Sequence, residues 1–172
     1  MRALPSILAG VLSMIAFNST SSAFTLQTTA FSDQHTVPAI YTCDGKDVSP
    51  ALSWTGVPEK TVSLALIVAD PDAPSGTFYH WVVYNIPTSI TEFPEGKLPV
   101  SVTEGKSSWG SAHYRGPCPP QGATHHYIFT LYALDDKLTL PPGADAKMLL
   151  DAMKTHVLDK AELTGLYSRT HK

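Results

Sequence analysis

Residues 62–74 read Val-Ser-Leu-Ala-Leu-Ile-Val-Ala-Asp-Pro-Asp-Ala-Pro, an apolar run followed by a proline-rich turn. The run 62–69 is interrupted by a single serine, a pattern typical of a central strand that is buried on both faces. Proline fixes φ and removes a backbone donor, so the turn holds its flanking groups in one geometry. His80-Trp81 then opens a second apolar run. The stretch predicts two buried strands joined by a rigid turn.

A second stretch of the chain has the same arrangement. Gly116-Pro-Cys-Pro-Pro-Gln-Gly122 leads into His125-His126-Tyr127 at the start of another apolar run. In both stretches a turn rich in proline or glycine places a histidine at the start of a predicted strand. A lone aspartate in a turn or a lone histidine at a strand start is commonly structural. The repetition favours a small preorganised polar pocket formed by Asp70, Asp72, His80 and His125.

The other segments predict a mostly β fold. Alternating or continuous apolar residues rich in β-formers predict strands at 24–31, 36–42, 49–54, 80–86, 126–134 and 162–169. Apolar residues at helical spacing predict one helix at 144–157, after Pro141-Pro142-Gly143. Residues 87–121 are rich in Pro, Gly and Ser, and so long a loop is usually functional. We expect a mostly antiparallel β-sandwich with one or two small peripheral helices.

The N-terminus has the features of a secretory signal peptide. Met1-Arg2 supplies a positive charge, residues 3–17 are almost entirely apolar, and Ser21-Ser22-Ala23 provides small residues for cleavage. A membrane anchor is the alternative, but the apolar run is shorter than the roughly 20 residues of a spanning helix. The sequence predicts cleavage of residues 1–23, a single mature domain at 24–172, and export to the periplasm or beyond.

Charge and cysteine content narrow the class of protein further. The formal net charge is −3 and the chain has no basic block, which argues against nucleic acid as a partner. Outside residues 1–23, no hydrophobic segment is long enough to span a membrane. Cys43 and Cys118 are the only cysteines. In an exported chain they predict a disulfide, with two buried thiols as the alternative.

The polar cluster has three possible roles. Imidazole and carboxylate can bind a divalent metal, but the familiar ligand spacings are absent. They can act in acid–base catalysis, but no serine lies in a nucleophile elbow. They can also bind a charged ligand without transforming it. For an anion, the attraction would come from protonated imidazoles, with pKa values raised by the aspartates, and from backbone N–H groups of residues 116–124. Such binding would weaken as the pH rises through the histidine pKa values.

These motifs resemble the phosphatidylethanolamine-binding protein family, also called the Raf kinase inhibitor protein family. The resemblance is carried by Asp70-Pro-Asp-Ala-Pro74 with His80, and by Pro119-Pro120-x-Gly122 with His125-x-Tyr127. Cys43-Asp-Gly and Gly116-Pro-Cys-Pro-Pro120 are similar to the bacterial Raf-kinase-inhibitor-like branch. The resemblance implies a Greek-key β-sandwich with an anion pocket. By motif position, its residues are Asp70, Asp72, His80, Pro120, His125 and Tyr127.

Two departures from the family pattern affect the expected function. His126 stands where many members carry arginine, so a charge that helps to hold an anion becomes dependent on pH. Animal members carry a C-terminal helix across the pocket mouth, and we expect none after the final strand of this chain. Kinase switching that depends on such a lid is therefore not expected.

The leading functional hypothesis is an exported protein that binds a small phosphorylated ligand or a phospholipid head group. It requires no metal or cofactor and no catalysis. The alternative is a protease or kinase inhibitor, or a host-interaction protein. It would act through the surface of residues 87–115, with Trp109 and Tyr114 exposed. Weak hydrolysis, with a histidine as general base, ranks third.

Overall fold

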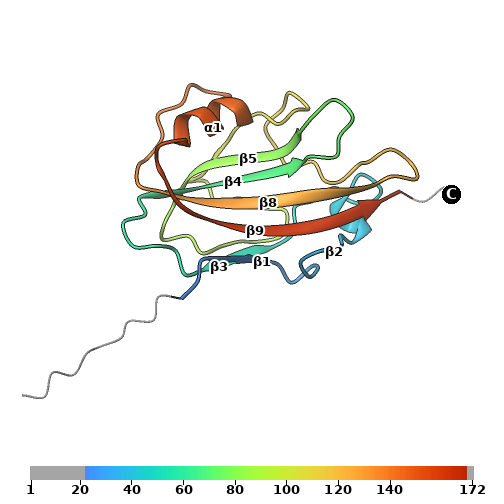
Figure 1. Ribbon diagram of the computed structural model, residues 1–172, viewed down its shortest axis with the longest axis horizontal. Helices are drawn as coiled ribbons and strands as arrows, with labels where there is room; N and C mark the ends of the chain where they lie inside the picture. Colours follow the sequence, from blue (N-terminus) through green and yellow to red (C-terminus); the bar gives the residue numbers. More distant parts are fainter. Residues whose placement is uncertain (1–21, 170–172) are drawn as a thin grey trace, which may run out of the picture.

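The computed structural model describes residues 22–169, which form two β-sheets, one helix and connecting loops (Figure 1). In spatial order the larger sheet contains β2 (His35–Thr36), β9 (Val157–Ser168), β8 (Thr124–Leu134), β4 (Ser63–Asp70), β5 (Phe78–Pro87) and β7 (Thr103–Glu104). The smaller sheet contains β1 (Thr25–Gln27), β3 (Leu52–Thr55) and β6 (Glu92–Phe93). The predicted mostly β fold with two sheets is confirmed.

The predicted signal peptide, residues 1–23, lies outside the described residues except for its last two positions. Within residues 22–169, no helix is long and apolar enough to cross a membrane.

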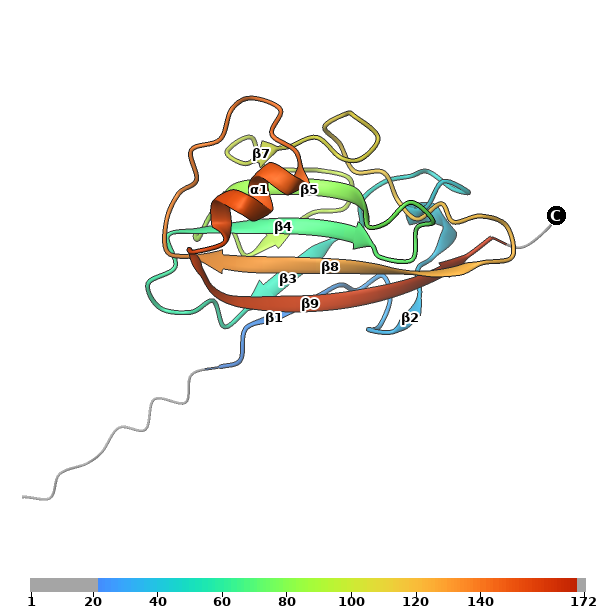
Figure 2. The ribbon, with the colours of Figure 1, turned by 45° about the horizontal axis from the view of Figure 1, so that its top comes forward.

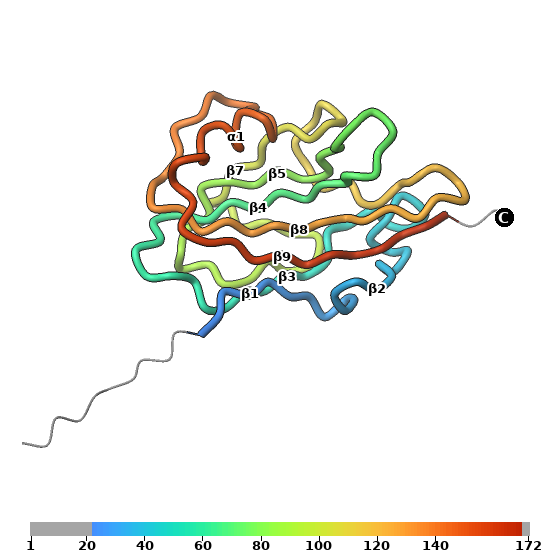
Figure 3. Tube along the Cα trace, viewed as in Figure 1, coloured from blue at the N-terminus to red at the C-terminus, as the bar shows by residue number. Residues whose placement is uncertain are grey.

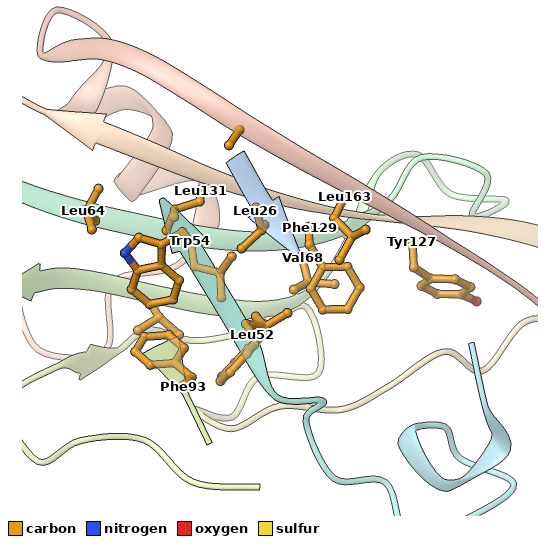
Figure 4. Packing of buried hydrophobic residues seen from close by; sticks show 14 of the residues in the cluster. Leu26, Leu52, Trp54, Leu64, Val68, Phe93, Tyr127, Phe129, Leu131 and Leu163 are labelled. Atoms are coloured by element: carbon orange, nitrogen blue, oxygen red, sulfur yellow. The ribbon is translucent and has the colours of Figure 1, made fainter. Parts of the chain in front are cut away.

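The main hydrophobic core lies between the two sheets. Side chains alternate between the faces of a strand, so Leu64, Leu66 and Val68 of β4 point toward the smaller sheet. The intervening residues Ala65 and Ile67 belong to a second cluster on the opposite face. Figure 4 shows the main core, in which Leu26, Leu52, Trp54 and Phe93 of the smaller sheet meet Leu64, Val68, Phe129, Leu131 and Leu163 of the larger sheet. Because β4 is hydrogen-bonded to both β5 and β8, the prediction of a central strand is confirmed.

The single helix of the described region, α1 (Ala146–Met153), covers the other face of the larger sheet. Figure 2 shows α1 in front of this sheet and β3 behind it. Asp145 caps the helix, because its side chain accepts a hydrogen bond from the Met148 backbone N–H at 2.9 Å. Leu149 and Met153 pack into the second cluster. The helix is shorter than predicted at both ends.

Other elements also differ from the predictions, and the strand predicted at 24–31 is limited to β1 (Thr25–Gln27). Val157 starts β9 rather than ending the helix, because it pairs with Leu134 of β8. The predicted strand at 36–42 is mostly a 3₁₀ helix, η1 (Ala39–Tyr41), which follows Pro38. Only β2 precedes it, and β2 pairs with β9 in parallel. Residues 87–121 contain the two short strands β6 and β7, which periodicity did not reveal.

Several loops meet at one end of the larger sheet. In Figure 3 the turn between β4 and β5, the segment that leads into β8 and the end of β9 lie at the same end of the molecule. This follows from the antiparallel pairing of β4 with both β5 and β8, and of β8 with β9. The two motif stretches therefore lie close together, as the sequence predicted.

Candidate functional site

Asp70 and His125 meet at this end of the larger sheet. Asp70 follows Leu66 and Val68 on the alternating inward face of β4, and His125 precedes Tyr127 on the same face of β8. His125 Nδ1 lies 2.7 Å from Asp70 Oδ2, and both side chains are less than a tenth exposed. Because a carboxylate only accepts hydrogen bonds, Nδ1 carries the proton and Nε2 is left for another partner. The Asp70–His125 pair is therefore buried on the face of the larger sheet that carries the main core.

His80 reaches the same site through a β-bulge. Val68 pairs with Trp81 and the next residue, Ala69, pairs with Tyr79, so His80 is an extra residue in β5. Tyr79 packs against the second cluster and Trp81 packs in the main core, and these two lie on opposite faces of the sheet. A bulge changes the direction of a side chain without disturbing the alternation on either side of it. Here it places the buried His80 imidazole against the inward-facing Tyr127, with ring centroids 5.2 Å apart.

The surroundings of His80 favour the neutral imidazole, whereas a protonated one was expected from the sequence. Burial lowers its pKa below the ordinary value, although the Arg115 carbonyl and the nearby Asp70 charge oppose the shift. Its Nδ1–H donates to the Arg115 carbonyl oxygen at 2.8 Å, so Nε2 of the neutral ring is an acceptor. Asp70 does raise the pKa of His80, as expected, but the loss of hydration on burial outweighs this attraction.

A cavity of about 340 Å³ opens over these groups. Its polar lining consists of Asp70, His80, His125 and Arg169. The remaining lining is largely apolar and consists of Ala73, Pro74, Phe78, Trp109, Cys118, Pro119 and Pro120. The Phe78 and Trp109 rings meet edge to face, with centroids 5.0 Å apart. The cavity thus combines ionisable groups with an aromatic and proline-rich wall, the usual composition of a small-molecule site.

Asp72 lies beside this cavity but does not line it. Its Oδ2 accepts hydrogen bonds from the backbone N–H of His126 at 2.8 Å and from His126 Nδ1 at 2.7 Å. The His126 N–H bond is the main cause of the lowered pKa of Asp72, followed by the side-chain bond. Both side chains are nearly half exposed. Asp72 and His126 therefore fasten the turn after β4 to the start of β8 on the outer face.

Of the other two predicted site residues, Pro120 lines the cavity and Tyr127 does not. Tyr127 is fully buried behind His80. Burial raises the pKa of its phenol, and the nearby Asp70 charge adds to the effect. Its hydroxyl oxygen is buried and has no well-formed hydrogen bond within the described residues. Tyr127 supports the imidazole from behind instead of facing a ligand.

Three backbone N–H groups of residues 116–124 are used within the protein. The Gly116 N–H donates to Asp47 Oδ1 at 2.6 Å, and the Gly122 N–H donates to the Arg169 carbonyl at 3.1 Å. The Ala123 N–H donates to the Pro120 carbonyl at 3.2 Å. Prolines in the segment have no N–H to offer. These hydrogen bonds stabilise the loop itself, and these three amides are not free to attract an anion.

Cys43 and Cys118 form a disulfide, as one of the two interpretations predicted. It joins residues 75 apart in the sequence, and their Cα atoms lie 5.4 Å apart. The backbone N–H of Cys43 also donates to the Pro117 carbonyl at 3.1 Å. Because Cys118 lines the cavity, the disulfide fixes the proline-rich wall to the segment after η1.

Arg169, Trp109 and Phe78 are lining residues that sequence reasoning did not assign to the pocket. Trp109 is 42% exposed, but its exposed ring forms part of the cavity wall. Tyr114, expected to be exposed, packs against the main core, and its hydroxyl donates to the Tyr41 carbonyl at 2.9 Å. No motif pointed to Arg169, because it lies at the end of β9, far along the chain from both stretches.

Within residues 22–169, no group of three or more His, Cys, Asp or Glu side chains is arranged to hold a metal ion. The geometry provides a buried carboxylate–imidazole pair, a neutral imidazole with a free acceptor, and an arginine. This set can exchange hydrogen bonds with a small ligand that carries oxygen acceptors and an acidic proton.

Comparisons with known proteins agree with this arrangement. A family model described as phosphatidylethanolamine-binding protein matches residues 27–168. A UPF0098 protein of Methanothermobacter thermautotrophicus is 51% identical over 149 residues, which cover 84% of this chain and 98% of the relative.

Two solved structures share the fold. A phosphatidylethanolamine-binding protein homologue of Chlamydia trachomatis has a TM-score of 0.81 at 39% identity, and the match covers 86% of this chain and 98% of that one. E. coli YbcL, described as a member of the mammalian family, has a TM-score of 0.81 at 31% identity, with 86% and 99% covered. With its two-sheet fold and its match to the family model over residues 27–168, the chain belongs to the phosphatidylethanolamine-binding protein family.

Proposed function

We propose that the protein binds a small ligand with a phosphate group, either a free phosphate ester or a phospholipid head group. One observation carries the proposal: the Asp70–His125 pair and His80 line the same cavity. Both imidazoles use Nδ1 within the protein, so Nε2 of each is left for the ligand. The proposal concerns binding without chemical change.

A phosphate group in its singly protonated form matches these groups. Its acidic O–H can donate to the neutral His80 ring at Nε2. Its anionic oxygens can accept from His125 Nε2 when that ring is protonated, and from the Arg169 guanidinium. The buried Asp70 carboxylate then balances the His125 charge instead of repelling the ligand directly. This balance of charge explains how an aspartate can lie in a site that binds an anion.

The size and lining of the cavity favour a head group over an intact lipid. A volume of about 340 Å³ is near the lower end of the range for small-molecule sites, about 300–1,000 Å³. The Trp109 and Phe78 rings, together with the prolines, can contact the organic part of such a ligand. Two acyl chains would extend well beyond this volume.

Catalysis is not part of the proposal. Among the residues of 22–169 that line the cavity there is no serine or threonine, and the one cysteine is held in the disulfide. A histidine held by an aspartate can act as a general base, but covalent catalysis also requires a nucleophile beside it.

Export forms a second part of the proposal. It rests on the signal-like residues 1–23 and on the disulfide, since disulfides persist mainly in oxidising compartments. Mass spectrometry of protein from the periplasmic and extracellular fractions would test it, and a mature chain that begins at Phe24 is expected. Recovery of the full-length chain from the cytoplasm alone would contradict it.

Calorimetric titration tests the binding proposal, with three ligands that separate the sources of the phosphate. Phosphoethanolamine represents the free ester, glycerophosphoethanolamine represents the lipid head group, and ethanolamine lacks the phosphate. We expect binding of the first or the second and none of the third. The variant His125→Asn keeps a donor near the position of Nδ1 but removes Nε2, so it should abolish binding. Its matched control, His126→Asn, changes the adjacent residue outside the cavity and should bind like the wild type.

Absence of binding by all three ligands at pH 5.5 and pH 8 would contradict the proposal. Equal binding of ethanolamine would show that the phosphate is not recognised.

A further inference from the structure

We propose that Arg169 supplies the fixed positive charge that binds the ligand phosphate, and that Asp44 positions it. This inference rests on the proposed function and adds a specificity-determining residue to it. Among the residues lining the cavity in the described chain, Arg169 alone carries a permanent positive charge.

The need for such a residue follows from the site itself. His80 is neutral, because burial lowers its pKa. The amides of Gly116 and Gly122 are occupied by bonds within the protein. The buried Asp70 carboxylate offsets the charge of a protonated His125, so this pair adds no net positive charge to the cavity. An anionic ligand therefore depends on a cation at the cavity, and Arg169 is in position to be that cation.

Arg169 is held in place by both its side chain and its main chain. Its Nε donates to the Asp44 carboxylate, at 3.1 Å from Oδ1 and 3.3 Å from Oδ2. Its carbonyl accepts the Gly122 N–H, and its backbone bridges to Gln121. The residue is thus bound to the loop that carries Pro119 and Pro120 of the cavity wall.

Asp44 is also held from more than one direction. Its Oδ2 accepts a hydrogen bond from the Tyr167 hydroxyl at 2.9 Å. Its neighbour Cys43 is bonded to Cys118, which lines the cavity. The Asp44 side chain is therefore a rigid support, and its two hydrogen bonds to Arg169 both use Nε. The two terminal nitrogens, which bind phosphate most effectively, are not used by Asp44.

The contact of Asp44 with Arg169 Nε indicates that Arg169 binds the ligand and does not only stabilise the fold. An arginine whose charge served only to pair with Asp44 would be expected to form the bidentate contact through its terminal nitrogens. The contact through Nε instead orients the guanidinium while leaving its outer edge available. The Arg169 and Asp44 side chains are 33% and 34% exposed, so a ligand can approach them.

The test uses phosphoethanolamine and two variants at the same position. Arg169→Gln keeps much of the length and a donor for Asp44 but removes the charge, and it should weaken binding about tenfold or more. Arg169→Lys keeps the charge and should retain more of the affinity than the glutamine variant. Raising the salt concentration should weaken binding by the wild type more steeply than binding by Arg169→Gln.

Lys46→Gln is the matched control. Lys46 is exposed and lies two residues after Asp44, and it is not among the described residues that line the cavity. This variant also removes one positive charge and should bind within about twofold of the wild type. Urea denaturation of each variant checks that the fold is intact.

The outcomes separate the two proposals. If the wild type binds phosphoethanolamine and Arg169→Gln binds it equally well, the role of Arg169 is wrong while the proposed function stands. A Lys46→Gln variant that loses as much affinity as Arg169→Gln also overturns it, because the loss is then an effect of the overall charge of the protein. If the wild type binds neither phosphoethanolamine nor glycerophosphoethanolamine, both proposals fail.

Discussion

His125 and Asp70 are joined by a contact of 2.7 Å between Nδ1 and Oδ2, with both side chains buried. His126, the next residue after His125, and Asp72, two residues after Asp70, form a second contact of 2.7 Å on the exposed side of the strand. The turn after β4 is therefore fastened to β8 by one buried pair and one exposed pair. The two ion pairs have equal distances, but they should contribute differently to stability, because one is buried and the other is exposed to solvent.

The first prediction compares the two histidines. His125→Ala leaves the Asp70 carboxylate buried without its partner, and we expect the free energy of unfolding to fall by about 3–5 kcal/mol. His126→Ala breaks the exposed pair and should cost about 0–1 kcal/mol. Urea denaturation at pH 7 measures both values. Similar losses for the two variants would contradict the distinction between them.

The two aspartates should differ in their effect on ligand binding. Asp70 lines the cavity, and Asp72 does not. Asp70→Asn is expected to weaken phosphoethanolamine binding about tenfold, because an amide cannot balance the charge of a protonated His125. Asp72→Asn should change the affinity by less than about twofold. Calorimetric titration provides the comparison, and a larger effect of Asp72→Asn would place the ligand on the outer face.

His80 should make the protein less stable as the pH falls. Burial lowers the pKa of His80 in the folded protein, whereas the unfolded chain keeps the ordinary value of about 6.5. Below that value the unfolded chain binds a proton that the folded protein does not, so unfolding becomes more favourable. Its stabilising contribution is complete above pH 6.5 and is lost as the pH falls toward the lowered pKa. The free energy of unfolding should fall less steeply between pH 7.5 and pH 5 in His80→Asn than in the wild type.

Loss of the disulfide should affect stability and binding together. The double variant Cys43→Ala/Cys118→Ala opens a loop defined by a separation of 75 residues, and the chain-entropy model gives a loss of about 4 kcal/mol. Because Cys118 lines the cavity, phosphoethanolamine should also bind more weakly. Denaturation of the wild type with and without dithiothreitol is an independent measurement. Unchanged phosphoethanolamine binding by a folded double variant would show that the cavity wall keeps its structure without the disulfide.

Trp109 should report ligand binding by fluorescence. It is 42% exposed and lines the cavity, whereas Trp54 and Trp81 are almost completely buried in the main core. Phosphoethanolamine should therefore change the long-wavelength part of the emission, and Trp109→Phe should abolish the change. A change that persists in this variant would come from the core tryptophans and would contradict binding beside Trp109.

The sequence predicts those parts of the structure that depend on local patterns. The apolar run of β4 and the proline-rich turn after it identify a central strand and its end, and both motif stretches do meet at one end of the sheet. The proximity of Asp70, His80 and His125 also follows from the repeated arrangement, but the specific pairing of Asp70 with His125 does not. The boundary between α1 and β9 does not, since Val157 fits helical spacing as well as strand pairing and is fixed only by its partner Leu134.

Features that depend on strand register could not be read from the sequence. The extra residue at His80 exists only in relation to β4, so no pattern within β5 reveals it. The neutral state of His80 depends on burial by residues distant in the chain. Arg169 and Asp44 are 125 residues apart, and although Asp44 belongs to the Cys43-Asp-Gly motif, nothing in that motif points to Arg169. Their contact arises because the end of β9 lies beside the disulfide-linked segment.

Because His80 is an extra residue in β5, a mutation could remove it from the cavity without altering the packing of the main core. Tyr79 pairs with Ala69 and Trp81 pairs with Val68, so deletion of His80 alone would join two residues that already occupy consecutive positions of a regular ladder. Trp81 would keep its place in the main core, and Tyr79 would keep its place against the second cluster. A single codon loss could thus remove an imidazole from the cavity without a change of strand register, and a single insertion could restore it.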